Sequence, residues 1–121
     1  MLQSVQETKP DTINLSESNT AESEKLSMDE ILLNKLRNAV VDNLKNEQFS
    51  VEDLAEEVAF SRSHLHRKLQ KLTGESISQF IRNIRLSHGL EHLKNNVGTV
   101  SEIAYKVGFG SSTYFIKCFH D

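Results

Sequence analysis

The amino-acid sequence predicts an all-α protein made of two helix-turn-helix subdomains joined by a long linker helix. The first observation is a repeat, because SVEDLAEEVAF at residues 50–60 returns as TVSEIAYKVGF at residues 99–109. The second is a helix-start signal that recurs along the chain, in which Ser or Thr precedes Glu, Asp or Gln by three residues. The third is that no segment alternates apolar and polar residues as a strand would. Two copies are too few for a solenoid, so the repeat indicates a pair of supersecondary units.

The expected helices follow in order along the chain. Residues 1–27 are polar and rich in Ser, Thr, Asn and Glu, and we expect a disordered acidic linker or tether there. A capping box at Ser27 and Glu30 predicts the start of the first helix. The later boxes are Ser50 with Asp53, Ser76 with Gln79, and Thr99 with Glu102. We therefore expect six helices, at about residues 28–46, 51–58, 62–73, 77–95, 100–107 and 112–121.

The second helix of the first repeat has one apolar stripe. Leu65, Leu69 and Leu72 fall at i, i+4 and i+7, which is the spacing of a buried face. Ser61 is expected to cap this helix, and Phe60 before it is expected to pack on Leu65 as a hydrophobic staple. The helix should therefore bury its leucines and turn its polar side chains outward.

The second repeat matches the first best when its last part is shifted by 50 residues instead of 49. This offset aligns the leucine stripe with Phe115 and Phe119. We therefore expect one extra residue in the second turn, near Gly110, and Ser111 as the equivalent helix cap.

The outward faces of these two helices carry side chains that suit a DNA major groove. Arg and Lys can bind guanine, Ser and His can bind either partner of a base pair, and an aliphatic side chain can contact a thymine methyl group. A single polar face is more typical of an ordinary solvent-exposed helix, but two repeated motifs with the same pattern favour DNA binding. The outward residues are Arg62, Ser63, His66, Arg67, Gln70 and Lys71 in the first helix, and Ser112, Thr113, Ile116, Lys117 and His120 in the second.

The expected linker helix, at residues 77–95, is apolar on more than one side, which suits a rod packed against both motifs. About 19 residues at 1.5 Å each span roughly 28 Å, close to the repeat of one duplex turn, about 34 Å. Two recognition helices on such a rod could enter successive major grooves without a dimer. Gly89 in its middle either allows a close helix approach or softens the rod, and we favour close packing.

The charge of the chain is unevenly distributed. The formal net charge of −3 conceals an acidic start, because residues 1–30 hold two Lys and seven Asp or Glu. Residues 61–94 hold seven Lys or Arg against two Glu, together with four of the five His. A local positive field of this kind favours binding to phosphate.

Other functional classes find little support. No nucleophile motif, phosphate-binding loop or zinc-protease motif occurs, so we expect no enzyme and no cofactor. The histidines His88 and His92, with His64 and His66, lack a convincing third ligand, and no metal site is expected. Cys118 is the single cysteine and is expected to be a small packing residue. No membrane span or signal segment is recognisable.

Three segments together resemble the DNA-binding domain of AraC/XylS-type bacterial transcription regulators. They are SVEDLAEEVAFSRSHLHRKLQKLTG, SISQFIRNIRL and TVSEIAYKVGFGSSTYFIKCF, and the resemblance covers residues 31–121. It implies homeodomain-like three-helix units, with a first unit at about 28–74, a linker helix at about 77–95 and a second unit at about 99–121. The second helix of each unit, at about 62–73 and 112–121, would enter the major groove.

The resemblance also implies roles for individual residues. The base-reading positions would be Ser63, His66 and Arg67 in the first unit, and Ser112, Thr113, Ile116 and Lys117 in the second. The phosphate contacts would be Ser61, Arg62, Lys71 and Ser111, aided by helix N-termini.

The family pattern continues beyond the second recognition helix, whereas this chain stops at Asp121. We therefore expect an incomplete second unit, cut before the last helix of the family. The resemblance implies a missing N-terminal sensor or receiver domain, RNA polymerase as a partner and a cytoplasmic location, including the cytoplasmic end of a membrane-bound sensor. The alternative is a helical protein-interaction module that does not bind DNA.

Overall fold

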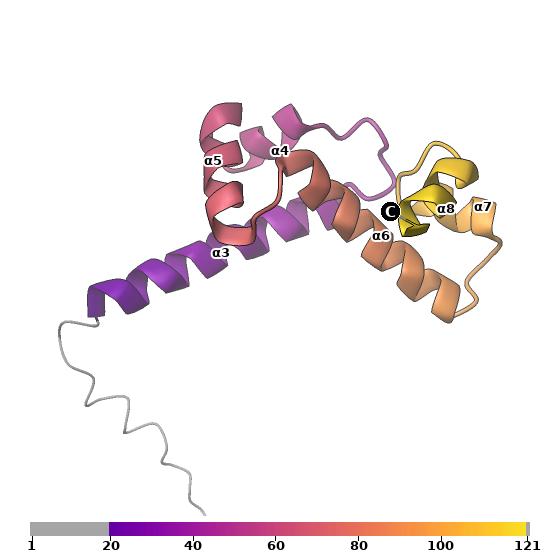
Figure 1. Ribbon diagram of the computed structural model, residues 1–121, viewed down its shortest axis with the longest axis horizontal. Coiled ribbons are helices and arrows are strands. Elements are labelled where there is room, and N and C mark those ends of the chain that lie inside the picture. Colours follow the sequence, from indigo (N-terminus) through magenta and orange to yellow (C-terminus); the bar gives the residue numbers. More distant parts are fainter. Residues whose placement is uncertain (1–19, 121) are drawn as a thin grey trace, which may run out of the picture. The chain divides into compact units, whose positions relative to one another are not determined.

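The computed structural model describes residues 20–120, with side chains from residue 27 onward, and contains only helices in that range (Figure 1). The all-α prediction is therefore confirmed. The helices are α3 (Thr20–Asp42), α4 (Val51–Glu57), α5 (Arg62–Thr73), α6 (Ile77–Lys94), α7 (Val100–Lys106) and α8 (Ser112–His120). Of the described residues, those from 34 onward form one compact unit, and those before residue 34 belong to another.

Three of the four predicted capping boxes start helices in the structure. They belong to α4, α6 and α7, with Ser50, Ser76 and Thr99 as the N-cap residues. In each box the cap hydroxyl accepts the N–H of the third helical residue, whose side chain accepts the N–H of the cap. The Thr99 N–H donates to the carboxylate of Glu102 at 2.8 Å, and this bond lowers the pKa of Glu102.

The fourth box, at Ser27, is wrong as a helix start. Helix α3 begins at Thr20, so the last part of the predicted disordered linker is helical, while residues 1–19 lie outside the described part. The segment 21–26 consists mainly of good helix formers, and its two glutamates favour the start of a helix. The helix also ends earlier than predicted, at Asp42, because the Asn43 side chain donates to the Ala39 carbonyl at 2.8 Å.

The turns of the two motifs differ by one residue, as the sequence predicts. Residues 58–61 connect α4 to α5, whereas residues 107–111 connect α7 to α8, and Gly110 is the added residue. Each turn passes through the left-handed region at the equivalent position, with φ of 58° at Ala59 and 89° at Gly108. Ser61 and Ser111 cap the following helices, accepting the N–H groups of the third residues beyond them.

The aromatic residue in each turn makes a different contact. The ring of Phe109 is buried and packs on Phe115, with centroids 5.1 Å apart. The half-buried ring of Phe60 stacks on His64, with centroids 4.0 Å apart. The second motif therefore depends more heavily on aromatic packing than the first.

The apolar stripe predicted for α5 is buried. Leu65 and Leu69 are inaccessible to solvent, while Leu72 is half-buried. Helix α5 contacts both α4 and the start of α6. The other buried side chains before residue 82 belong to α3, α4, α6 and the loop between α3 and α4; they are Leu36, Ala39, Val40, Phe49, Leu54, Ala55, Ile77, Phe80 and Ile81.

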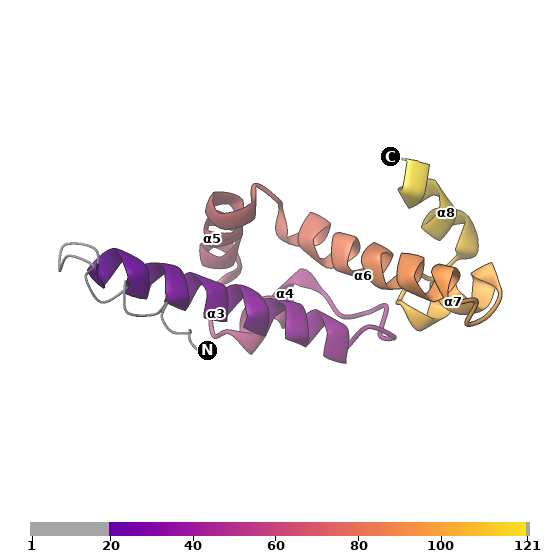
Figure 2. The same cartoon turned by 90° about the horizontal axis from the view of Figure 1, so that it is seen from below.

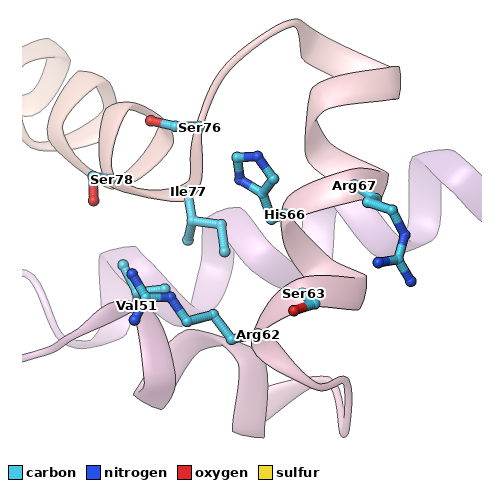
Figure 3. A pocket seen from close by; sticks show the side chains of 8 residues that line it. All are labelled: Val51, Arg62, Ser63, His66, Arg67, Ser76, Ile77 and Ser78. Carbon is cyan, nitrogen blue, oxygen red and sulfur yellow. The ribbon is translucent and has the colours of Figure 1, made fainter.

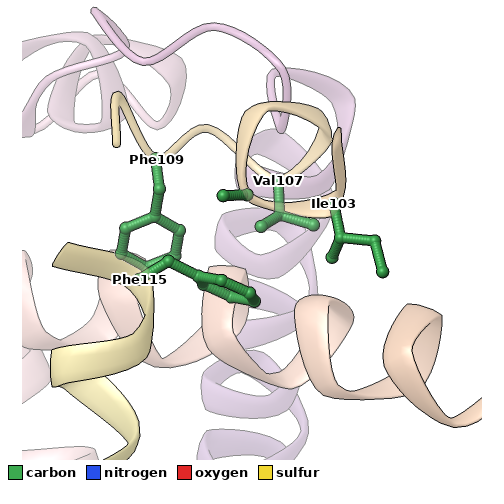
Figure 4. Close-up of a cluster of buried hydrophobic side chains, with 5 residues drawn as sticks. Ile103, Val107, Phe109 and Phe115 are labelled. Carbon is green, nitrogen blue, oxygen red and sulfur yellow. The ribbon is translucent and has the colours of Figure 1, made fainter. Parts of the chain in front are cut away.

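A second cluster of buried side chains surrounds Phe115 (Figure 4). It consists of Ile103, Ala104, Val107, Phe109 and Phe115, with Leu44, Leu86, Leu93 and Cys118 packed against it. Helix α6 approaches this cluster at Gly89. A Cβ atom built there would lie only 2.5 Å from Cε1 of Phe115, so the close-packing interpretation of Gly89 is confirmed.

Arg85 of α6 is buried although it is charged, with 6% of its surface exposed. Its guanidinium donates to the carbonyls of Leu44 and Val107 through Nη1 and to that of Asn46 through Nη2. Burial lowers the pKa of Arg85, and the nearby charge of Glu47 opposes that shift. Arg85 thus joins the loop after α3, helix α6 and the turn after α7.

Gly89→Ala is expected to destabilise the domain. The added methyl group would overlap the fully buried Phe115 ring, and overpacking costs about 1–3 kcal/mol. The better helix propensity of Ala offsets about 1 kcal/mol of this. Urea unfolding should show a net loss, whereas the matched change Ser87→Ala, at an exposed position of the same helix, should have little effect. Equal stability of the two variants would contradict the close approach of α6 to Phe115.

Arg85→Ala should lower the free energy of unfolding by roughly 1–3 kcal/mol, because it leaves buried carbonyl oxygens without donors. Arg85→Lys should recover only part of this loss, since one ammonium group cannot reproduce the guanidinium fork. Thermal or urea unfolding measures both. A Lys variant as stable as the original would show that positive charge alone, without the three-carbonyl geometry, is sufficient.

Candidate nucleic-acid interface

The predicted reading face of α5 borders a hollow on the surface. Arg62, Ser63, His66 and Arg67 line it from α5 and are all exposed (Figure 3). Residues 76–78, at the start of α6, line the opposite side, together with Val51. Four of the predicted DNA contacts of the first motif therefore share one concave surface.

Arg62 makes an ion pair that the sequence did not predict. Its Nη1 lies 2.8 Å from Oε2 of Glu52, and the side chains of Arg62 and Glu52 are 65% and 62% exposed. Exposed pairs of this kind contribute little to stability, so the pair leaves the Arg62 guanidinium accessible to other anions. Ten residues separate the two in sequence, and no helical spacing within one element indicates such a pair.

The two cap serines present the same local geometry to solvent. The hydroxyl oxygens of Ser61 and Ser111 accept backbone N–H groups at 3.1 Å and 3.0 Å, and both residues are exposed. Each hydroxyl keeps its own hydrogen for donation. The free N–H groups of the first helical turn lie beside it, which is the usual arrangement for phosphate at a helix start.

The predicted reading face of α8 is also accessible. Thr113, Ile116 and Lys117 are exposed, and Ser112 is half-buried. Ile116 is 45% exposed although it is aliphatic, whereas Phe115 beside it is fully buried. Lys71, at the end of α5, is exposed as well, so ten of the eleven predicted contact residues are exposed and one is half-buried.

The two helices that carry these residues lie in the compact unit of residues 34–121. Figure 2 shows α5 beside the beginning of α6 and α8 beside its later turns. Helix α6 contacts both of them. Both helices therefore pack on the same linker helix.

Other kinds of site are not formed by the described residues. Within that part of the chain, no three His, Cys, Asp or Glu side chains gather in a way that could hold a metal ion. No described helix has the length and apolar character required to cross a membrane.

The chain is similar to known helix-turn-helix proteins. A family model described as a helix-turn-helix domain matches residues 54–121. The chain is 42% identical over 93 residues to histidine kinase P4 of Formosa agariphila, covering 77% of this chain and 7% of that protein. It is 32% identical over 91 residues to the transcriptional activator RhaR of Enterobacter sp. (strain 638), covering 75% of this chain and 32% of RhaR.

Solved structures with the same fold include two bacterial regulators. One is the C-terminal domain of the two-component response regulator yesN from Fusobacterium nucleatum, with a TM-score of 0.61 and 25% identity over 70% of this chain and 90% of that one. The other is a DNA-binding transcriptional dual regulator from Escherichia coli K-12, with a TM-score of 0.65 and 22% identity over 74% of this chain and 78% of that one.

These matches define a helix-turn-helix DNA-binding domain of transcription regulation rather than an enzyme domain. More specifically, the chain belongs to the AraC/XylS family. It spans only 7–32% of the length of the two curated relatives described above.

Proposed function

We propose that this domain binds double-stranded DNA sequence-specifically by placing α5 and α8 in successive major grooves. The observation that carries the proposal is the sorting of side chains on these two helices. Leu65, Leu69 and Phe115 are fully buried, whereas the polar side chains beside them on the same helices are largely exposed.

The length of α6 supports simultaneous binding. Helix α6 has 18 residues, which at 1.5 Å each give a rod of about 27 Å. Successive major grooves on one face of B-DNA are about 34 Å apart. In this proposal α5, which lies beside residues 76–78, and α8, whose Phe115 lies against Gly89 further along α6, reach neighbouring grooves of one duplex.

In this proposal, different residues contact the base edges and the phosphates. The exposed residues in the middle of each reading face contact base edges: Ser63, His66 and Arg67 of α5, and Ser112, Thr113, Ile116 and Lys117 of α8. The phosphate contacts lie at the ends of these faces and in the caps: Ser61, Arg62, Lys71 and Ser111.

We further propose that the domain is the output module of a larger cytoplasmic signalling or regulatory protein. The matched relatives include a histidine kinase and a transcriptional activator, each much longer than this chain. The acidic N-terminal segment would then serve as the tether to a sensor or receiver domain, and RNA polymerase would be the partner at the promoter.

Selection of bound duplexes from a randomised pool tests the proposal, since a sequence-specific domain should enrich one motif with two separated halves. A protein-interaction module predicts no enrichment, and any duplex affinity would then be equal for all sequences.

Arg67→Ala should cost about 1–3 kcal/mol on the selected site and relax the preference at one base pair. Lys71→Ala should instead weaken binding to all sequences similarly and lower the salt slope by about one. Fluorescence anisotropy titrations on selected and random duplexes, at several salt concentrations, separate the two effects. Equal losses on both duplexes for Arg67→Ala would refute its role in base reading.

A further inference from the structure

A second hollow lies along α6, between the two recognition helices. It is lined by Ser78, Ile81, Arg82 and Arg85 of α6, and on its other sides by Glu47, the 108–110 turn and Tyr114. Ser78 also lines the hollow beside α5. The hollow beside α5 and the hollow beside the first turn of α8 therefore adjoin at Ser78.

Arg82 is the accessible cationic side chain of this hollow. It is half-exposed, and in the described part of the chain no hydrogen bond or ion pair engages its guanidinium. Arg85, three residues further on, is buried and donates to three backbone carbonyls. Ser78 is exposed four residues before Arg82, on the same face of the helix.

The charge of the hollow also favours an anion. Two arginines and one glutamate line it, and the glutamate, Glu47, acts electrostatically on buried Arg85. If Glu47 compensates Arg85, the charge of Arg82 remains uncompensated. A free guanidinium beside a hydroxyl group is well suited to a phosphate oxygen.

The position of the hollow identifies which phosphates it would meet. When two helices occupy successive major grooves on one face of a duplex, the minor groove between them faces the protein midway. The hollow lies between the first turns of α5 and α8, so the sugar-phosphate backbone bordering that minor groove would pass in front of it.

We propose that Arg82, assisted by Ser78, is a third DNA contact, which binds the phosphates bordering the central minor groove. This inference rests on the proposed function. It makes the linker helix a binding element in addition to a spacer, and it predicts an affinity contribution that does not depend on the sequence between the two half-sites.

Arg82→Ala should weaken binding about tenfold at 0.1 M salt and lower the salt slope by about one, which is the contribution of a single phosphate contact. The loss should be the same for A·T-rich and G·C-rich spacers between the half-sites. Arg82→Lys should retain most of the affinity, because an ammonium group also binds phosphate. A loss confined to A·T-rich spacers would overturn the phosphate assignment in favour of minor-groove base reading.

Arg37→Ala is the matched control. It removes the same charge from an exposed arginine that donates to Asn34 and lines a different hollow with Phe80, Asn83 and Ile84. At 100° per residue, those α6 positions lie on the face opposite to Ser78 and Arg82. Arg37→Ala should change the affinity for DNA by less than about twofold, since in the proposed complex the side chain of Arg37 lies far from the duplex.

Glu47→Gln tests the same hollow by removing a negative charge instead of a positive one. Loss of the negative charge of Glu47 should strengthen binding to DNA a few-fold, and circular dichroism should show the folded helical content unchanged.

If Arg67→Ala weakens binding while Arg82→Ala matches the original chain, the third contact is refuted and the proposed function stands. If the original chain binds no duplex at all, the proposed function itself fails.

Discussion

The buried guanidinium of Arg85 is the contact on which the arrangement of the domain depends. Burying a charge is costly unless hydrogen bonds replace the lost water, and here three backbone carbonyls do so. Two of these carbonyls belong to the loop after α3 and the third to the turn after α7. One side chain of the linker helix therefore binds both the loop and the turn. The position of the Arg85 guanidinium also explains the glycine at position 108, because a Cβ atom there would overlap the guanidinium.

The second motif is held to the linker helix by one further close contact, between Phe115 of α8 and Gly89 of α6. The same ring packs on Phe109 in the turn and on Phe119, with centroids 5.1 and 5.0 Å apart. Because residue 115 is fully buried, its neighbours 116 and 117 are turned outward. The packing of the core thus determines which side chains of α8 are exposed, and in α5 the buried Leu65 and Leu69 have the same effect.

Local features of this fold were predictable from the sequence, and long-range ones were not. The caps at Ser50, Ser76 and Thr99 and the extra residue at Gly110 follow from signals within a few residues. The contacts of Arg85 could not be predicted in this way, since its acceptors lie 22 to 41 residues away. These acceptors are backbone carbonyls, which every residue has, so the sequence does not indicate which of them Arg85 binds. The same limit applies to the surface: the exposure of the predicted contact residues could be inferred from periodicity, whereas the pairing of Arg62 with Glu52 depends on how two helices meet.

The central claim is that one rigid body presents two recognition helices at a fixed separation, so that both bind the same duplex together. The most direct test measures affinity for the selected site after insertion of base pairs between its two halves. An insertion of about 5 base pairs turns one half-site to the far side of the duplex, and the account predicts that affinity then falls to that of a single half-site. Affinity that stays the same for every insertion length would contradict it.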